Sequence, residues 1–193
     1  APLYPGGALS LCKFLRAAAC EINFFEKIVK NVFGGNMENK KAAEVVKRLA
    51  ARNEKITFAE SCTGGLAAAE LVAVPDASKV FDGSFVTYAE EAKIALVGVE
   101  AQTVATYGVV SEEVAREMAV GSAKRIGCAV GVGITGFAGP TGGTANAPVG
   151  TVCFGFYIDG KVYSFTVRFG NIGRNNVREK RVGFVYSTLC ELM

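Results

Sequence analysis

The sequence predicts a three-layer α/β/α fold with a mostly parallel mixed sheet and an antiparallel hairpin at one edge. Helical and strand patterns alternate along most of the chain, which is typical of parallel strands joined by helices. Residues 126–158 contain no charged side chain, and nine glycines and two prolines interrupt them. This composition favours two buried strands around a glycine-rich loop over a membrane span. Asp159-Gly160 then predicts a two-residue hairpin turn, which supplies the antiparallel edge.

Composition limits the functions that the chain can have. Its 193 residues are half apolar and one-fifth charged, as expected of one domain with a short appendage. The net charge of +3 is spread along the chain without a basic block, which argues against nucleic acid as a partner. Histidine is absent, so Ser-His and Cys-His nucleophile pairs within the chain are excluded, together with histidine-bound metals.

The cysteines indicate the compartment. None of the six belongs to a C-x-x-C pair, and most lie in apolar runs where a reduced thiol packs as a small hydrophobe. We therefore expect the protein to belong to a reducing compartment, the cytoplasm, and to have no metal site, cofactor or membrane partner. A homodimer is the expected assembly, because it is the commonest one.

The first 36 residues differ from the rest of the chain. They begin with the turn-rich segment APLYPGG and continue as a helix-compatible stretch that acidic residues interrupt, which argues against a signal peptide. Met37 follows Gly34-Gly35-Asn36 and resembles an initiator. We expect residues 1–36 to be a leader or extension and residues 37–193 to form the domain.

The first half of that domain alternates helices with short strands. Residues 38–53 place alanine, valine and leucine on one helical face and charged residues on the other. Residues 56–58 favour a strand, and a polar turn joins them to a helix over residues 64–74. A strand over residues 79–88 and a helix over residues 89–97 are predicted next.

The second half contains the buried strands. Residues 101–107 predict a short helix. Ser111, followed by two glutamates, predicts the N-cap of a helix that continues to residue 126. The remaining predicted elements are strands over residues 128–135, 149–158 and 161–169 and a last helix over residues 174–192.

The turn after the first strand is the first candidate site. It contains Ser61, Cys62 and Thr63 in succession and then two glycines. Unpaired backbone N–H groups at the start of the following helix favour an anion or a developing oxyanion. The sequence leaves all three side chains as candidate nucleophiles. The alternative is that Ser61 or Thr63 caps the helix and Cys62 packs in the core.

A serine nucleophile in a chain without histidine needs another base. A lysine serves when burial lowers its pKa and populates the neutral amine. Tyr88 and Lys93 lie where a predicted strand passes into a helix, a usual place for site residues in open α/β sheets. The alternative is an ordinary strand tyrosine and a solvated lysine.

The glycine-rich loop over residues 135–144 is compatible with a phosphate site. Its closely spaced glycines allow backbone N–H groups to approach an anion, although a wide turn has the same composition. The residues of this loop predicted to contact a ligand are Thr135, Gly136, Ala138 and Gly139.

Two arginines near the end of the chain also suit an anion. Arg174 and Arg178 lie four residues apart at a predicted helix start, where their charges oppose the helix dipole. An anionic ligand would compensate them, and the alternative is a surface ion pair.

Five ordered motifs resemble those of a known family. They are Ala59-Glu60-Ser61-Cys62-Thr63-Gly64-Gly65; Phe85-Val86-Thr87-Tyr88 with Lys93; Gly108-Val109-Val110-Ser111-Glu112-Glu113-Val114; Thr135-Gly136-Phe137-Ala138-Gly139-Pro140 with Gly142-Gly143; and Pro148-Val149-Gly150-Thr151-Val152. Together they resemble the competence/damage-inducible protein CinA C-terminal domain family over residues 37–193.

The resemblance implies an amidohydrolase that converts nicotinamide mononucleotide to nicotinic acid mononucleotide and ammonia, without a metal. It maps a catalytic serine, lysine and tyrosine onto Ser61, Lys93 and Tyr88. The residues then expected to bind the nucleotide are Cys62, Thr63, Gly64, Thr135, Gly136, Ala138, Gly139, Arg174 and Arg178. The alternatives are a cysteine amidase that uses Cys62 and a non-catalytic nucleotide-binding or regulatory module.

The sequence departs from the family pattern in two places. The usual Tyr-Ser-Asn before the lysine is Tyr88-Ala89-Glu90 here, which removes one hydroxyl and one amide. The usual Gly-Asp-Arg before the last helix is Ile172-Gly173-Arg174, which removes a carboxylate. These changes motivate the non-catalytic alternative.

Overall fold

A five-stranded mixed sheet organises the protein. The structure, a computed structural model, describes residues 38–193, so the leader or extension predicted for residues 1–36 lies outside the described residues. The strands are β1 (Ile56–Glu60), β2 (Phe85–Val86), β3 (Val130–Gly136), β4 (Thr151–Ile158) and β5 (Lys161–Arg168). Their order is β2-β1-β3-β4-β5, with β1 parallel to β2 and β3, and with antiparallel β3–β4 and β4–β5 pairs. The predicted sheet with its edge hairpin is confirmed.

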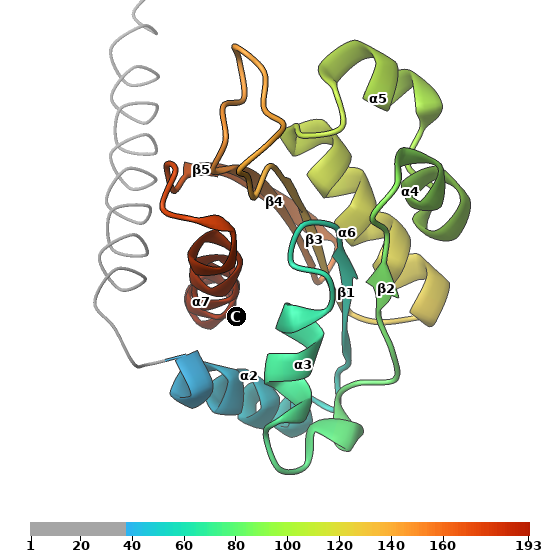
Figure 1. Cartoon of the computed structure of the whole chain (residues 1–193). Coiled ribbons are helices and arrows are strands. Elements are labelled where there is room, and N and C mark those ends of the chain that lie inside the picture. The colour runs from blue at the N-terminus through green and yellow to red at the C-terminus, as the bar shows by residue number, and fades with distance from the viewer. Residues whose placement is uncertain (1–37) are drawn as a thin grey trace, which may run out of the picture. The chain divides into compact units, whose positions relative to one another are not determined.

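Helices cover both faces of this sheet, which confirms the three-layer architecture (Figure 1). The described helices are α2 (Glu38–Arg52), α3 (Leu66–Val72), α4 (Glu90–Val97), α5 (Ala101–Tyr107), α6 (Glu112–Ile126) and α7 (Arg174–Leu192), with a 3-10 turn η1 (Ala77–Lys79). The layer formed by α2, α3 and α7 packs on one face, and α6 with α4 and α5 packs on the other. Ser111 caps α6 by accepting from the N–H of Val114, as predicted.

Glycines in the sheet explain why α6 packs so closely. Gly131, Gly133 and Gly155 all face α6. A Cβ at Gly133 would lie 2.2 Å from the carbonyl oxygen of Ala115, closer than any real contact. The bare strand surface therefore lets the helix backbone lie directly on β3 and β4.

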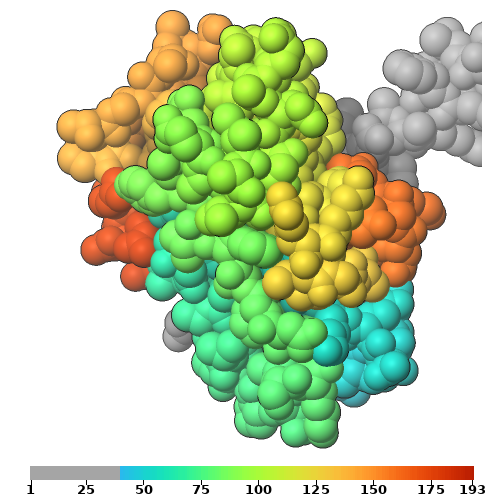
Figure 2. Space-filling model, turned by 90° about the vertical axis from the view of Figure 1, so that its right-hand side faces the viewer, coloured from blue at the N-terminus to red at the C-terminus, as the bar shows by residue number. Residues whose placement is uncertain are grey.

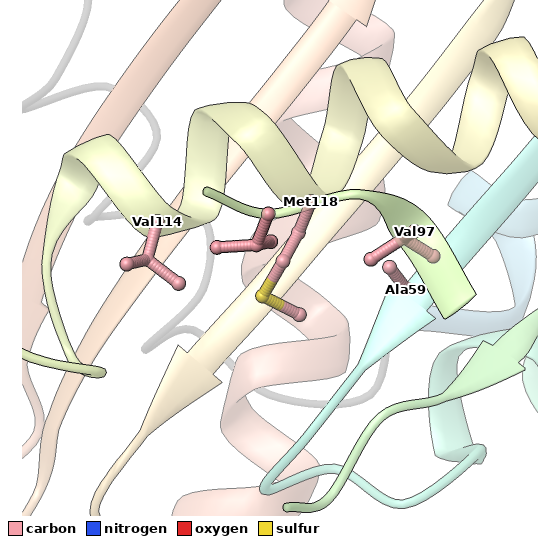
Figure 3. Packing of buried hydrophobic residues seen from close by; sticks show 5 residues of the cluster. Ala59, Val97, Val114 and Met118 are labelled. Atoms are coloured by element: carbon pink, nitrogen blue, oxygen red, sulfur yellow. The ribbon is translucent and has the colours of Figure 1, made fainter. Parts of the chain in front are cut away.

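A small apolar cluster joins α6 to α4 and β1. It consists of Ala59, Val97, Val99, Val114 and Met118, each at most 2% exposed (Figure 3). Phe85 and Val104 pack against it. This cluster fixes the C-terminal end of α4 against the sheet. It thereby holds the helix that contains Lys93 at a defined distance from the end of β1.

Two predicted elements differ from the structure. The strand predicted over residues 79–88 is limited to Phe85–Val86, because the preceding residues form η1 and an irregular segment around Asp82-Gly83. The helix predicted from residue 64 begins at Leu66, since Gly64 and Gly65 adopt left-handed φ angles of 62° and 94°. Among residues 38–193, no helix is both long and apolar enough to cross a membrane.

Candidate active site

The candidate site lies where the three parallel strands end. Ser61 directly follows β1 and its N–H donates to the carbonyl oxygen of Ile134 in β3 at 2.9 Å. Thr87 follows β2, and its N–H donates to the carbonyl of Glu60 at 2.7 Å. Carboxyl ends of parallel strands share one edge of a sheet, so this topology brings Ser61, Tyr88 and the end of β3 together.

The N-terminus of α3 is already occupied by a side chain of the protein. Glu60 is fully buried, and its carboxylate accepts from the N–H groups of Gly65, Ala67 and Ala68 at 3.0, 3.1 and 2.9 Å. The expectation that these amides would bind a ligand anion is therefore wrong. Glu60 neutralises the helix terminus instead and holds the turn in shape.

Lys93 is the partner of Ser61. Its Nζ lies 3.2 Å from Ser61 Oγ and donates to the carbonyl of Thr87 at 2.8 Å, with longer contacts to the carbonyls of Tyr88 and Ala89. The side chain is only 1% exposed and forms no ion pair within residues 38–193. Burial lowers the pKa of Lys93, and weaker interactions with Cys62, Glu90 and Glu91 oppose this shift. A buried amine with a lowered pKa beside a hydroxyl can act as a general base.

The two other candidate nucleophiles of the turn are less suited to attack. Cys62 is 5% exposed, and burial raises the pKa of its thiol, which disfavours the thiolate. Thr63 is fully buried, and its hydroxyl has no hydrogen-bond partner among the described residues. The geometry thus favours Ser61 among the three candidate nucleophiles that the sequence left open.

Tyr88 has a different immediate partner. Its hydroxyl accepts from Arg174 Nη2 at 3.0 Å, and the side chain is 61% exposed. Among the hydrogen bonds of residues 38–193, none joins this hydroxyl to Ser61 or to Lys93. Only the backbone carbonyl of Tyr88 reaches the lysine amine, at 3.3 Å.

A cleft of about 450 Å³ contains most of the predicted residues. Its size is within the usual range for small-molecule sites. Those predicted residues that line it are Ser61, Cys62, Tyr88, Lys93, Thr135, Gly136, Ala138, Gly139 and Arg174. Thr63, Gly64 and Arg178 do not line it. Figure 2 shows the outer surface of α4 and α5 in green, with the loop that follows β3 projecting beside them in orange.

The arginines of α7 tie this helix to the site. Arg174 Nη1 donates to the carbonyl of Gly139 at 2.9 Å, which attaches the start of α7 to the glycine-rich loop. Arg178 Nη2 donates to the carbonyl of Thr63 at 2.9 Å, so it connects α7 to the turn that contains Ser61. Both acceptors are neutral. The surface ion pair considered as an alternative does not occur within the described residues.

Sequence reasoning missed two charged residues. Glu60 precedes Ser61, and a carboxylate at the end of a buried strand just before a helix was a usable signal. Arg181 is fully buried on α7, and its spacing of seven residues from Arg174 places both on one helical face. The seven-residue spacing from Arg174 was the only signal in the sequence for a buried arginine at position 181.

The two departures from the family pattern fall on helix N-caps. Ala89 is the N-cap of α4 and Gly173 is the N-cap of α7, and neither helix has a side-chain cap. In α4, Glu90 and Glu91 supply negative charge in the first turn. The first turn of α7 contains no acidic residue, so the start of this helix is strongly positive. Across residues 38–193, no group of three or more histidine, cysteine or acidic side chains could hold a metal ion.

Comparison with known proteins identifies relatives of this chain. The family model for the CinA C-terminal domain matches residues 38–193. A CinA-like protein of Kosmotoga olearia is 41% identical over 167 residues, which is 86% of this chain and 40% of that protein. A CinA-like protein of Anaeromyxobacter sp. (strain K) is 56% identical over 108 residues, or 56% of this chain and 26% of that protein. The chain thus spans less than half the length of these relatives.

Solved structures resemble the chain over a larger share of their length. A competence-damaged protein (CinA) superfamily protein from Escherichia coli has a TM-score of 0.78 at 36% identity, covering 81% of this chain and 90% of that one. A competence/damage-inducible protein from Agrobacterium tumefaciens has a TM-score of 0.79 at 35% identity, covering 82% and 96%. The fold is therefore shared over nearly the whole of these structures.

Proposed function

Because the chain belongs to the CinA C-terminal domain family, we propose that it hydrolyses the carboxamide of nicotinamide mononucleotide to nicotinic acid mononucleotide and ammonia. One observation carries the proposal: the buried amine of Lys93 lies 3.2 Å from Ser61 Oγ inside a cleft. Amide hydrolysis through an acyl-enzyme requires a nucleophile and a base, and this pair supplies both without a histidine.

The first half-reaction forms an acyl-enzyme. Neutral Lys93 takes the hydroxyl proton of Ser61 while the serine oxygen forms a bond to the carboxamide carbon. Backbone N–H groups at Cys62 or at the Gly136 turn stabilise the oxyanion, an effect worth about 3 kcal/mol per donor in other hydrolases. The protonated amine then gives its proton to the departing nitrogen, the C–N bond breaks, and ammonia leaves.

The second half-reaction regenerates the serine. A water molecule gives a proton to Lys93 and attacks the ester carbon, and the acid is released as the serine oxygen recovers the proton. Tyr88 borders the same cleft and, in this proposal, orients the leaving group or relays its proton. Its hydroxyl is held by Arg174 at 3.0 Å, which places the tyrosine beside the cationic end of the cleft.

The cationic end supports a phosphorylated substrate. Arg174 and the glycine-rich loop line the cleft, and Arg178 contacts the turn that contains Thr63. In this proposal Arg174 and the loop amides around Gly139 contact the ribose phosphate, with Arg178 acting through the Thr63 turn. Guanidinium groups and closely spaced backbone amides are common phosphate ligands.

The direct test is ammonia release from nicotinamide mononucleotide by the wild type, Ser61→Ala and Cys62→Ala. We expect Ser61→Ala to lose at least 1,000-fold in kcat, on the order of the loss when a catalytic nucleophile is removed, and Cys62→Ala to keep most activity. Equal rates in wild type and Ser61→Ala would refute the serine assignment. Loss in Cys62→Ala alone would favour the cysteine amidase.

A binding measurement addresses the non-catalytic alternative, which the uncapped starts of α4 and α7 still motivate. Calorimetry with nicotinamide mononucleotide runs beside the ammonia assay. Tight binding without ammonia release by the wild type would identify a binding module and refute the amidase.

A further inference from the structure

Arg181 is the least satisfied charged group in the described structure. Its side chain is fully buried on α7, and Nε, Nη1 and Nη2 all have no hydrogen-bond partner among residues 38–193. It forms no ion pair in that part of the chain either. Buried guanidinium groups are normally paired, because an isolated buried charge is very unfavourable. Within the described residues, the charge of Arg181 is therefore not offset by a paired carboxylate.

Two more cations share the face of α7 that carries Arg181. Arg174 and Arg178 precede it by seven and three residues, which aligns the three side chains along the helix. Arg174 and Arg178 donate only to uncharged oxygens, those of Gly139, Tyr88, Thr63 and Asn175. The helix begins at Gly173 without a capping side chain, so the dipole adds further positive character.

Among residues 38–193, no carboxylate forms an ion pair with this row of three arginines. Burial lowers the pKa of Arg181, and repulsion from Arg174 and Arg178 lowers it further, while an interaction with Cys62 opposes these effects. Cys62 lies beside Ser61 in the reacting turn and lines the cleft. Arg181 does not itself line the cleft, so its effect on a ligand there is electrostatic.

We propose that Arg181 is a specificity-determining positioning residue, which selects ligands with an anionic group at the Arg174 end of the cleft. The inference rests on the proposed function for the identity of the reacting amide, but the anion preference is a separate property of α7. A charge buried in a medium of low dielectric constant keeps its field, whereas salt screens exposed Arg174. Arg181 therefore supplies the part of the attraction that salt does not remove.

The experiment compares a charged with an uncharged substrate. Kinetic constants for nicotinamide mononucleotide and nicotinamide riboside are measured for wild type, Arg181→Met and Arg181→Lys at low and high salt. We expect Arg181→Met to raise KM for the mononucleotide roughly tenfold at both salt concentrations and to leave the riboside unaffected. Arg181→Lys should restore most of the loss. Arg125→Met, which removes an exposed arginine of α6, controls for net charge.

A purely structural role would change both substrates equally, and this result would overturn the inference. If the wild type hydrolyses neither substrate, the proposed function fails, and the inference is decided by calorimetry with ribose 5-phosphate and ribose. Tighter binding of the phosphate that Arg181→Met abolishes would support it. Equal affinity of wild type and variant, or no preference in the wild type, would overturn it. Arg181→Gln is the uncharged substitute if Arg181→Met does not fold.

Discussion

Replacing Glu60 by alanine should destabilise the domain strongly, because this carboxylate holds together the turn that contains Ser61. Glu60 accepts three backbone N–H groups at 2.9 to 3.1 Å from one fully buried side chain. A hydrogen bond to a charged group contributes about 1.5–3 kcal/mol, and losses within one network add only partly. We expect Glu60→Ala to lower the free energy of unfolding by about 4 kcal/mol, since buried N–H groups of α3 are left without acceptors.

Urea unfolding followed by circular dichroism measures this difference. Glu70→Ala is the matched control, because the side chain of Glu70 extends from α3 without an ion pair to another residue of the described part. We expect its effect to stay within about 0.5 kcal/mol. A loss below about 1 kcal/mol for Glu60→Ala would refute the reasoning, because it would mean that water or a rearranged turn satisfies the same amides.

Two further variants test the base and the packing of the sheet. The pKa of Lys93 is lowered in the folded protein, so the unfolded chain binds the proton more tightly. The free energy of unfolding of the wild type should therefore increase as the pH rises from the folded-state pKa of Lys93 to that of an ordinary lysine. Lys93→Met should remove this rise, and parallel thermal unfolding curves check it, with identical pH slopes contradicting the burial argument. Gly133→Ala should cost about 2 kcal/mol or more, because its Cβ would meet the carbonyl of Ala115 at 2.2 Å. Gly83→Ala, whose Cβ would make an ordinary contact at 3.8 Å with Ile126, should unfold like wild type in urea.

The sequence predicted those elements whose signals are local. The helix over residues 174–192 and the short helix over residues 101–107 have the predicted bounds, and Ser111 caps α6 as its position before two glutamates indicated. The hairpin turn at Asp159-Gly160 and the buried strands on either side of the glycine-rich loop also followed from local composition. Each of these signals depends on neighbouring residues, which a single sequence displays directly.

Long-range contacts explain what the sequence did not predict. The aromatic and β-branched residues between positions 79 and 88 favour a strand, but only Phe85 and Val86 find a partner in β1. Glu60 resembled an ordinary strand residue until the fold placed it at the start of α3. In the same way, the hydroxyl of Tyr88 accepts a hydrogen bond from Arg174, which is 86 positions away in the sequence. The assignment of Ser61, Lys93 and Tyr88 as catalytic residues remains a prediction.

The site draws its groups from separate parts of the chain. Ser61 and Lys93 are 32 positions apart in the sequence, and both belong to the first half of the domain. The contact of Arg178 with Thr63 spans 115 residues, because the arginines belong to the last helix. In the proposed function, the reacting groups and the groups that select the ligand therefore belong to separate segments of the chain and can change independently. Under that proposal, a library restricted to the first two turns of α7 should alter the accepted ligand and preserve the pair of Ser61 and Lys93.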